Sequence, residues 1–469
     1  MATVSIDQRP LYKTLPIGQQ VIFTVSNNGI VATKFKVKFV AEVRVSGTAI
    51  NPNVATDLIG TFKTTPNNAG VGIFDFRPVL ETFVSPDNLP TKDTGLVFSK
   101  FKGTTSANQT FPIHIIDKYS LSDKSIKFFQ VRFLVEYSDT ASGAVVAPTL
   151  DVDSAEYTMF NGVLQYDNIL TQSVAGNDYG YNLQDFHLVD NDRKFLSNAP
   201  TTQYALLTDY GTLPFLNRLE LDGVTSTINY ITLTYYKADG SATAGVSDSI
   251  VNNGGSGGSA LFSQANSRLI YAGVFPANLQ NWSSNFALAM ADDLDYYTVQ
   301  AFTPTKSELY RINILCPNNK GYDPIRLTWL NQWGAWDYYT FNKRSTRSVK
   351  TKRIPYTQLG GTWNQSTFQI DDYKGGRKNF RVNSSEAIKI NTDFVTEDEG
   401  VWFEEMMNSP EVYILKGFSA DEPQTITNKY IEPVTVKTST YIRKTIANDR
   451  LMQYTFEIEK TRTKRTQSV

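Results

Sequence analysis

Hydrophobic and polar residues alternate with a period of two in residues 34–45 and again in residues 130–137. Such alternation is typical of a β-strand that buries one face against a core and turns the other face to water. We therefore predict a strand at each place. In the first segment the expected buried face is Phe35, Val37, Phe39, Ala41, Val43 and Val45, and the expected wet face is Lys34, Lys36, Lys38, Glu42 and Arg44. In the second segment the two faces are Val131, Phe133, Val135 and Tyr137, against Gln130, Arg132 and Glu136.

Further strands are predicted where short runs rich in β-branched and aromatic residues are bounded by turn residues. Turn signals such as Asn161-Gly162 and Asp239-Gly240 separate these runs. The pattern predicts an all-β fold with multiple antiparallel sandwich-like or barrel-like domains. The additional strands are expected at 20–26, 111–116, 227–236, 309–315, 411–416, 432–443 and 451–459.

Two short helices are predicted as accessories to these sheets. The first lies near 397–407, where Thr396 and Glu399 have the spacing of a capping box and Pro410 ends the run. Its apolar side chains Trp402, Phe403, Met406 and Met407 are three or four residues apart, so that they could dock on a sheet. A second helical turn is expected at 79–84, directly after Pro78.

The length of 469 residues exceeds what one ordinary core accommodates. We predict an N-terminal β domain at 1–160, a middle β domain at 161–320 and a C-terminal β domain at 321–469 that contains the longer helix. The run 252–259 consists of Asn, Gly and Ser, has nothing to bury, and is predicted to be a flexible loop of the middle domain.

Charge and cysteine content narrow the functional classes. The chain has 45 Lys and Arg against 46 Asp and Glu, so the sequence as a whole is not that of a nucleic-acid-binding protein. Charged residues make up 19%, against about 25% in soluble domains, which favours surfaces covered by partners. A single cysteine, Cys316, excludes an intrachain disulfide. No apolar stretch is long enough to cross a bilayer, so no membrane partner is predicted.

Few residues offer catalytic or metal-binding chemistry. The two histidines are His114, which lies in a predicted strand, and His187, and we predict a structural or surface role for His114. Oxygen-rich clusters at Asp151, Asp153 and Glu156, at 190–192 and at 371–372 could hold calcium, but none has the spacing of a known calcium loop. Solvated loop charge is the preferred interpretation. No enzyme activity, catalytic residue, cofactor or metal is therefore predicted.

The segment 329–341 holds three of the six tryptophans in the chain. An aromatic platform for sugar rings is one interpretation, and a hairpin that fills a core or contacts another subunit is the preferred one. The residues concerned are Trp329, Asn331, Trp333, Gly334, Trp336 and Asp337.

A basic run follows directly, and a second basic group lies near the C-terminus. We predict that the run forms an interface between subunits or faces DNA in a channel, as a non-specific contact with packaged DNA. The run comprises Lys343, Arg344, Arg347, Lys350, Lys352 and Arg353, and the second group Lys460, Arg462, Lys464 and Arg465.

Three motifs in the last third of the chain occur in a recognisable order. Residues 327–341, which read LTWLNQWGAWDYYTF, resemble a signature of virion proteins of tailed phages of Bacteroidetes-type hosts, crAss-like phages among them. The helix near 397–407, the run Ser409-Pro410-Glu411-Val412-Tyr413 and the alternating strand 454–459 follow as they do in that family. The chain departs from the signature at Ala335, where a second glycine is expected, which puts a turn with two left-handed residues in doubt.

The resemblance implies a structural subunit in a symmetric ring of the tail or of the head–tail (neck) assembly of a short-tailed phage. Such a subunit would bind copies of itself as a cyclic homo-oligomer, together with neighbouring tail, neck or portal proteins. It would be assembled in the host cytoplasm and located in the virion. The family gives no catalytic residue to carry over.

Two other functions stay open on the residues alone. A receptor- or glycan-binding fibre, or a capsid decoration protein, would use the tryptophan-rich segment as a platform. A glycan-degrading enzyme would need a pair of carboxylates facing each other in a cleft, and spacing along the sequence does not locate such a pair.

Overall fold

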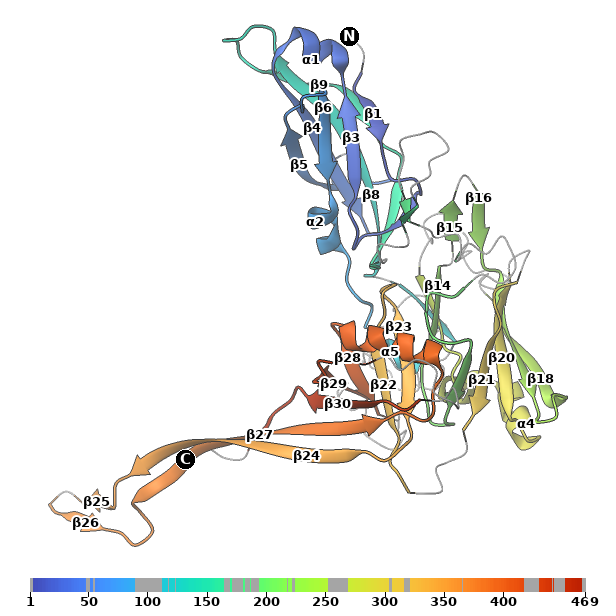
Figure 1. Ribbon diagram of the computed structural model, residues 1–469, viewed down its shortest axis with the longest axis vertical. Coiled ribbons are helices and arrows are strands. Elements are labelled where there is room, and N and C mark those ends of the chain that lie inside the picture. The colour runs from blue at the N-terminus through green and yellow to red at the C-terminus, as the bar shows by residue number, and fades with distance from the viewer. Residues whose placement is uncertain are drawn as a thin grey trace. The chain divides into compact units, whose positions relative to one another are not determined.

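The computed structural model describes most of the chain, and strands dominate it (Figure 1), which confirms the predicted all-β class with few short helices. The described residues are 3–47, 51–53, 55–88, 112–116, 118–122, 124–163, 169–170, 180–181, 186, 194–216, 218–221, 224–251, 269–302, 306–315, 321–364, 366–416, 430–440, 442 and 452–465.

The chain divides into two compact units. Unit 1 comprises Met1–Cys316, Leu330–Asp337 and Ser419–Thr427, and unit 2 comprises Pro317–Trp329, Tyr338–Phe418 and Asn428–Val469. The predicted boundary at 320 lies close to the start of unit 2, whereas the predicted domains 1–160 and 161–320 fall almost entirely within unit 1. The finer division into three domains stays a prediction, and the loop predicted at 252–259 lies outside the described residues.

The first part of unit 1 is built from two sheets that share an aromatic core. One sheet has the order β1-β3-β6, and the other β2-β10-β8-β4-β5, with β9 also paired to β8. Phe23 lies at the centre of the core, with its ring 5.5 Å from that of Phe133 and 5.7 Å from that of Tyr157. The strands are β1 (Ser5–Gln8), β2 (Thr14–Pro16), β3 (Ile22–Ser26), β4 (Phe35–Ser46), β5 (Leu58–Thr64), β6 (Val71–Asp75), β8 (Ile126–Ser138), β9 (Val146–Asp153) and β10 (Tyr157–Phe160), and the helices are α1 (Asn28–Thr33) and α2 (Arg77–Leu80), followed by a 3-10 turn (Glu81–Phe83).

Strand β4 follows the predicted alternation in its middle and departs from it at two residues. Phe39 and Val43 are buried as predicted, but Phe35 is 48% exposed and Arg44 only 1% exposed. The pairing with β8 shifts between Phe35 and Lys38, and this irregularity takes Phe35 out of the alternation that the sequence implies. Arg44 is covered because β4 lies inside the sheet, where its guanidinium lies 3.4 Å from Asp153.

The neighbouring strand β8 is also covered on both faces. Gln130 and Glu136, predicted to face water, are 8% and 6% exposed. The Gln130 side chain donates to the Ser154 carbonyl at 3.1 Å, and Glu136 pairs with Lys63. A central strand with neighbours on both sides therefore buries polar residues that the period-two pattern assigns to solvent, and Gln130 and Glu136 each have a partner there.

The rest of unit 1 contains a five-stranded sheet of order β13-β21-β20-β17-β18 and a three-stranded sheet of order β14-β19-β7. Helix α4 contributes Phe286, whose ring lies 5.6 Å from that of Tyr235 on β17. The strands are β7 (Tyr119–Leu121), β11 (Ile169–Leu170), β12 (Gly180–Tyr181), β13 (Thr202–Ala205), β14 (Leu213–Leu216), β15 (Arg218–Leu221), β16 (Val224–Thr227), β17 (Tyr230–Tyr236), β18 (Ala242–Val251), β19 (Leu269–Ala272), β20 (Tyr296–Phe302) and β21 (Tyr310–Ile314), and the helices are α3 (Pro276–Trp282) and α4 (Ser284–Ala291).

The strand predicted at 111–116 is wrong. Ile113–Ile115 form a 3-10 turn directly after Pro112, and all three of its side chains are buried. Because Pro112 has no backbone N–H to donate to a sheet, the segment turns at this point instead of extending a ladder. His114 lies inside this turn, 1% exposed, with its ring 5.1 Å from that of Trp336.

Unit 2 is one large antiparallel sheet covered by a helix. Its strand order is β23-β22-β28-β29-β30-β27-β24, with β31 also paired to β27. No helix among the described residues has both the length and the apolar character that a membrane crossing requires. The elements are β22 (Ile325–Leu330), β23 (Trp336–Phe341), β24 (Thr346–Gln358), β25 (Gly361–Trp363), β26 (Phe368–Ile370), β27 (Gly376–Asn391), α5 (Glu397–Asn408), β28 (Val412–Leu415), β29 (Ile431–Val436), β30 (Thr455–Lys460) and β31 (Lys464–Arg465).

Helix α5 confirms the predicted capping box and docks through the predicted apolar stripe. Thr396 accepts from the Glu399 backbone N–H while the Glu399 side chain accepts from the Thr396 backbone N–H. Burial raises the pKa of the Glu399 carboxyl. Trp402 packs 4.8 Å from Trp329, and Phe403 packs 4.8 Å from Tyr339 and 5.6 Å from Phe456. The helix thereby covers one face of the sheet.

The packing of α5 predicts a clear contrast between neighbouring helix positions. Phe403→Ala should lower the free energy of unfolding of unit 2 by about 3–4 kcal/mol, because a fully buried aromatic ring is lost and a cavity remains. Val401→Ala, at a position that is 45% exposed on the same helix, should change it by less than about 0.5 kcal/mol. Chemical denaturation monitored by tryptophan fluorescence measures both values. Equal losses at the two positions would mean that α5 is not docked through this face.

Candidate assembly interface

The six residues of the tryptophan-rich hairpin are buried. Trp329 and Trp336 have no exposed surface, Trp333 is 3% exposed, and Asn331 and Asp337 are also buried. The Asn331 side chain organises the loop: its Oδ1 accepts from the backbone N–H groups of Trp333 and Ala335 at 3.0 Å, and its Nδ2 donates to the Leu196 carbonyl at 2.9 Å. These rings are therefore core residues of the chain, and they do not form a surface on which a sugar could stack.

Side chains of the hairpin loop also form hydrogen bonds with distant residues of unit 1. The Trp336 Nε1 donates to the Asp87 carbonyl at 2.8 Å, and the Ser197 hydroxyl donates to Asp337 at 2.6 Å. Gly334 has φ +74, and a Cβ at this position would lie 1.7 Å from the carbonyl oxygen of Asn161. Of the loop residues Gly334 alone has a left-handed conformation, so Ala335 fits where the family signature has a second glycine.

The most exposed feature of unit 2 is a long two-stranded ribbon, which we call the arm and define as residues 346–391. Strand β24 pairs with β27 from Thr346 opposite Lys389 to Gln358 opposite Gly376. The 13 residues of β24 span about 44 Å at about 3.4 Å per residue. At the root of the arm, β27 also pairs with β30 and β31. Farther from the sheet, β24 and β27 pair only with each other, and they end in the β25–β26 hairpin (Figure 1).

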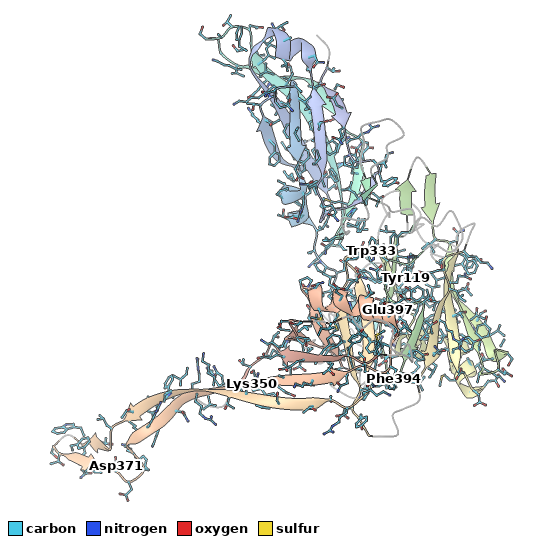
Figure 2. The ribbon with its side chains drawn as sticks, in the orientation of Figure 1. Tyr119, Trp333, Lys350, Asp371, Phe394 and Glu397 are labelled. Atoms are coloured by element: carbon cyan, nitrogen blue, oxygen red, sulfur yellow. The ribbon has the colours of Figure 1, made fainter. Side chains whose placement is uncertain are left out.

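The predicted basic run lies at the root of the arm and along its first strand. Lys343, before the arm begins, is 2.8 Å from Asp393, and Arg344 is exposed beside it. Arg347 and Arg353 lie on one face of β24, whereas Lys350 (labelled in Figure 2) and Lys352 lie on the other. The basic residues at 347–353 are all exposed, so that the arm is positively charged on both faces.

The second basic group meets the first at the arm. Strand β31 pairs with β27 so that Arg465 lies opposite Asn383, and Asn383 lies opposite Lys352 on the other side. Lys464 is 3.7 Å from Glu386. Two strips that are more than 100 residues apart in the sequence thus form one basic surface at the base of the arm.

The tip of the arm has one apolar face. Trp363 lies opposite Phe368, and Gly361 lies opposite Ile370, so these side chains share a face of the β25–β26 hairpin. Trp363 is 66% exposed, Phe368 51% and Ile370 82%. Eight of the 24 large hydrophobic side chains that are exposed among the described residues fall between 349 and 380, although this segment is under a tenth of the chain.

A single ion pair closes the turn next to the tip. The Lys374 ammonium contacts both Asp371 (labelled in Figure 2) and the Thr362 hydroxyl. The hydrogen bonds from Lys374 and Thr362 lower the pKa of the Asp371 carboxyl. Asp371 is therefore an ion-pair partner in the turn.

The acidic candidates at Asp151 and Asp153 form ion pairs. Asp151 pairs with Arg132 and Asp153 with Arg44, so these carboxylates form ion pairs on the sheet. Within the described ranges no group of three or more metal-ligating side chains comes together. Cys316, His187 and the cluster 190–192 lie outside the described residues.

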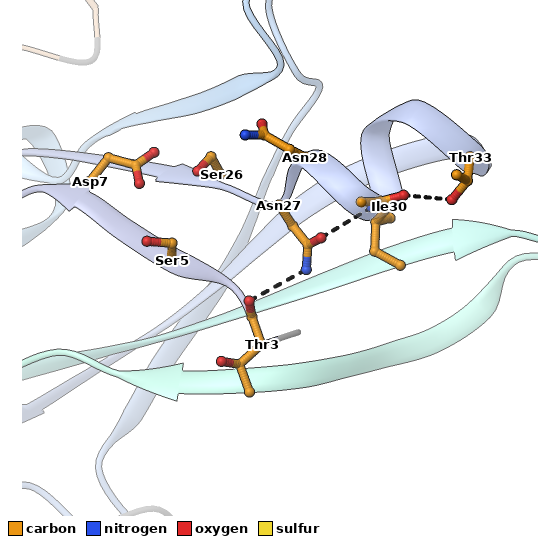
Figure 3. Close-up of a pocket in the computed structure, with 9 residues that line it drawn as sticks. Thr3, Ser5, Asp7, Ser26, Asn27, Asn28, Ile30 and Thr33 are labelled. Atoms are coloured by element: carbon orange, nitrogen blue, oxygen red, sulfur yellow. Dashed lines mark hydrogen bonds between the residues drawn. The ribbon is translucent and has the colours of Figure 1, made fainter. Parts of the chain in front are cut away.

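One polar hollow of about 520 Å³ lies beside the N-terminal strand and α1 (Figure 3). The Asn27 Oδ1 accepts from the Ile30 backbone N–H at 3.1 Å as the cap of α1, and Thr33 donates to the Gly29 carbonyl at 2.5 Å. Among the nine residues that line the hollow, Asp7 alone is ionisable. These groups serve the helix end and offer no second charged group for acid–base chemistry.

Comparison with known proteins adds little to this geometry. No family model and no curated protein matches the chain. A crystal structure of Salmonella alpha-2-macroglobulin reacted with methylamine is 9% identical, with a TM-score of 0.18, over 96% of this chain and 22% of that chain. The chain thus spans about a fifth of that protein, and a likeness at this score supports no functional conclusion.

The close approach at Gly334 gives a test of the hairpin loop. Gly334→Ala should lower the free energy of unfolding of unit 1 by at least about 2 kcal/mol more than Gly240→Ala, because it adds a backbone clash to a left-handed conformation. Gly240 is the matched control: it has φ +82, and its nearest neighbour is the Tyr296 hydroxyl at 3.9 Å. Thermal and urea unfolding measure the difference. Similar losses for both variants would show that the loop does not approach Asn161 as described.

Proposed function

We propose that the chain is a structural subunit of a phage virion, a ring protein of the tail or of the head–tail (neck) assembly. It acts through contacts with its own copies and with the proteins of adjoining rings. The motif series in the last third of the sequence supports the virion assignment, and the exposed arm supports a role in assembly. The proposed location is the virion, after assembly in the host cytoplasm.

The observation that carries the proposal is the apolar tip of the arm. An isolated two-stranded hairpin is at best marginally stable in water, because it has no second layer against which to bury side chains. Exposed apolar patches of this kind mark sites of contact with other macromolecules. Trp363, Phe368 and Ile370 lie on one face, and no layer in the described part of unit 2 covers them. The arm is therefore built to be completed by a partner.

The arm also favours a protein partner over DNA for the predicted basic run. Val349, Ile354 and Phe380 are 66%, 37% and 48% exposed between the charged residues of the arm. Backbone-directed DNA contacts rely on cationic and polar groups, and apolar side chains at these positions gain nothing from phosphates. A surface of alternating cationic and apolar side chains matches an interface between subunits instead.

Removing the arm tests this function directly. Lys350 and Ser385 lie directly opposite each other, so an Asn-Gly turn in place of residues 351–384 closes a short hairpin. This change keeps the pairing of β30 with β27 and removes only the partners of β31, Asn383 and Ser384. We expect the wild-type chain to form closed rings by electron microscopy of the purified protein, and the shortened chain to stay monomeric while keeping its unfolding midpoint. A shortened chain that forms the same rings would remove the arm from assembly, and a wild-type chain that stays monomeric under every condition would contradict the ring proposal.

A further inference from the structure

The charge of the arm is opposite to that of the rest of the chain. Residues 346–391 contain nine Lys and Arg against three Asp and Glu, a net charge of +6. Because the whole chain has a formal charge of -1, the remaining residues together carry -7. Two arms therefore repel each other, and an arm is attracted to the body of another copy.

The strongest concentration of negative charge in unit 2 is α5, which contains Glu397, Asp398, Glu399, Glu404 and Glu405 and no Lys or Arg. Of these side chains Glu397 and Asp398 are exposed, and the other three are half-buried. Trp402, Phe403 and Met406 face the sheet, so that positions 397, 401, 404 and 408 form the opposite stripe at helical spacing. Within that stripe Glu397 (labelled in Figure 2) is exposed, and Val401 is 45% exposed between carboxylates.

Only part of this acidity serves the stability of the helix. Carboxylates in the first turn, such as Glu397 and Asp398, interact favourably with the helix dipole, but Glu404 and Glu405 lie toward the C-terminal end, where the dipole disfavours negative charge. In the described part of the chain Glu397 and Asp398 have no ion-pair partner. The outward face thus keeps negative charge available for a partner.

The arm of the same copy does not supply that partner. It continues beyond the edge of the sheet in the direction of its strands, whereas α5 lies on the face of the sheet (Figure 1). The two surfaces have a similar spacing over a short stretch: residues on one face of a strand are about 6.8 Å apart, and positions 397 and 401 are about 6 Å apart along the helix axis. A cationic and an apolar residue of the arm can therefore fall on Glu397 and Val401 together.

We propose that the arm of one copy docks along the outward face of α5 of the next copy. Arg347 and Arg353, which share a face of β24 with Val349, contact Glu397 and Asp398, and Val349 contacts Val401. The contact is heterologous, since one surface of each copy meets a different surface of its neighbour, and repetition by rotation closes a ring. This inference rests on the proposed function and adds the identity of the surface that receives the arm.

Paired charge reversals test the contact. The arm-reversed chain carries Arg347→Glu, Lys350→Glu and Arg353→Glu, and the helix-reversed chain carries Glu397→Lys and Asp398→Lys. Each alone should raise the concentration of half-assembly, measured by analytical ultracentrifugation, by about a hundredfold or more, because like charges then meet. An equimolar mixture should assemble again, since each reversed surface finds its complement on the other chain. Raising the salt concentration should weaken both the wild-type and the mixed assemblies.

A control variant separates a specific contact from a change in net charge. Asp7→Lys with Asp295→Lys changes the net charge as much as helix reversal but lies in unit 1, and it should assemble like the wild type. Circular dichroism and the unfolding midpoint establish that the variants are folded.

The outcomes distinguish the inference from the function on which it rests. Assembly by the helix-reversed chain alone, or no rescue in the mixture, would overturn α5 as the receiving surface and leave the ring intact. A wild-type chain that never associates would overturn both. Arm reversal that abolishes DNA binding but leaves assembly unchanged would assign the cations to DNA and overturn the inference.

Discussion

A β-sheet must bury at least one of its faces, and in this respect the arm differs from the sheets of the two units. In both units the requirement is met internally: Phe23 and its aromatic neighbours fill the first sandwich, and α5 covers the sheet of unit 2 with Trp402 and Phe403. The arm leaves the sheet, and among the described residues it meets no second layer. Its tryptophan, Trp363, is 66% exposed, whereas Trp329, Trp333 and Trp336 are buried. Under the proposed function, this exposed ring is a place where another molecule covers the arm.

The hairpin loop 330–337 shows the opposite solution, in which polar groups are buried and satisfied. Asn331 holds the loop with two accepted and two donated hydrogen bonds, and Asp337 accepts from both Asn331 and Ser197. Two of these hydrogen bonds join the loop to Leu196 and Ser197. The tryptophan-rich motif is therefore part of the buried interior. A tryptophan-rich motif therefore indicates a glycan platform only when its rings are exposed, and here the exposed aromatic surface lies on the arm.

The sequence predicted what depends on neighbouring residues and missed what depends on distant ones. Period-two alternation located Phe39 and Val43 on the core face of β4, and local capping chemistry located α5 to within one residue at each end. The pattern assigns Arg44 to solvent because its partners Gln130 and Asp153 are 86 and 109 residues away in the chain. It assigns Gln130 to solvent because the Ser154 carbonyl, 24 residues away, is not visible in local alternation. The apolar residues on both sides of His114 predict a strand, but the chain forms a 3-10 turn there, directly after Pro112.

The arm itself was missed although its signals are local. Residues 346–358 include Thr, Val and Ile, and the pairs Gly360-Gly361 and Gly375-Gly376 mark turns at the tip. The strand is nevertheless not predicted, because Lys and Arg are frequent in the same segment. Helix α3 likewise begins at Pro276, and the N-cap Ser283 directly precedes α4. Both are local signals of a helix start that the predicted elements do not include. The meeting of the two basic strips at Lys352 and Arg465 could not be predicted, because it requires the pairing of β31 with β27.

The most direct measurement of the central claim is amide hydrogen exchange at the tip of the arm. The β25–β26 pairs, Gly361 with Ile370 and Trp363 with Phe368, should exchange rapidly in the dissociated chain, because an uncovered two-stranded hairpin opens readily. In the assembled ring the same amides should exchange at least about tenfold more slowly, because a neighbour covers the apolar face. Equal exchange rates in the two states would contradict the claim that the arm is completed by a partner.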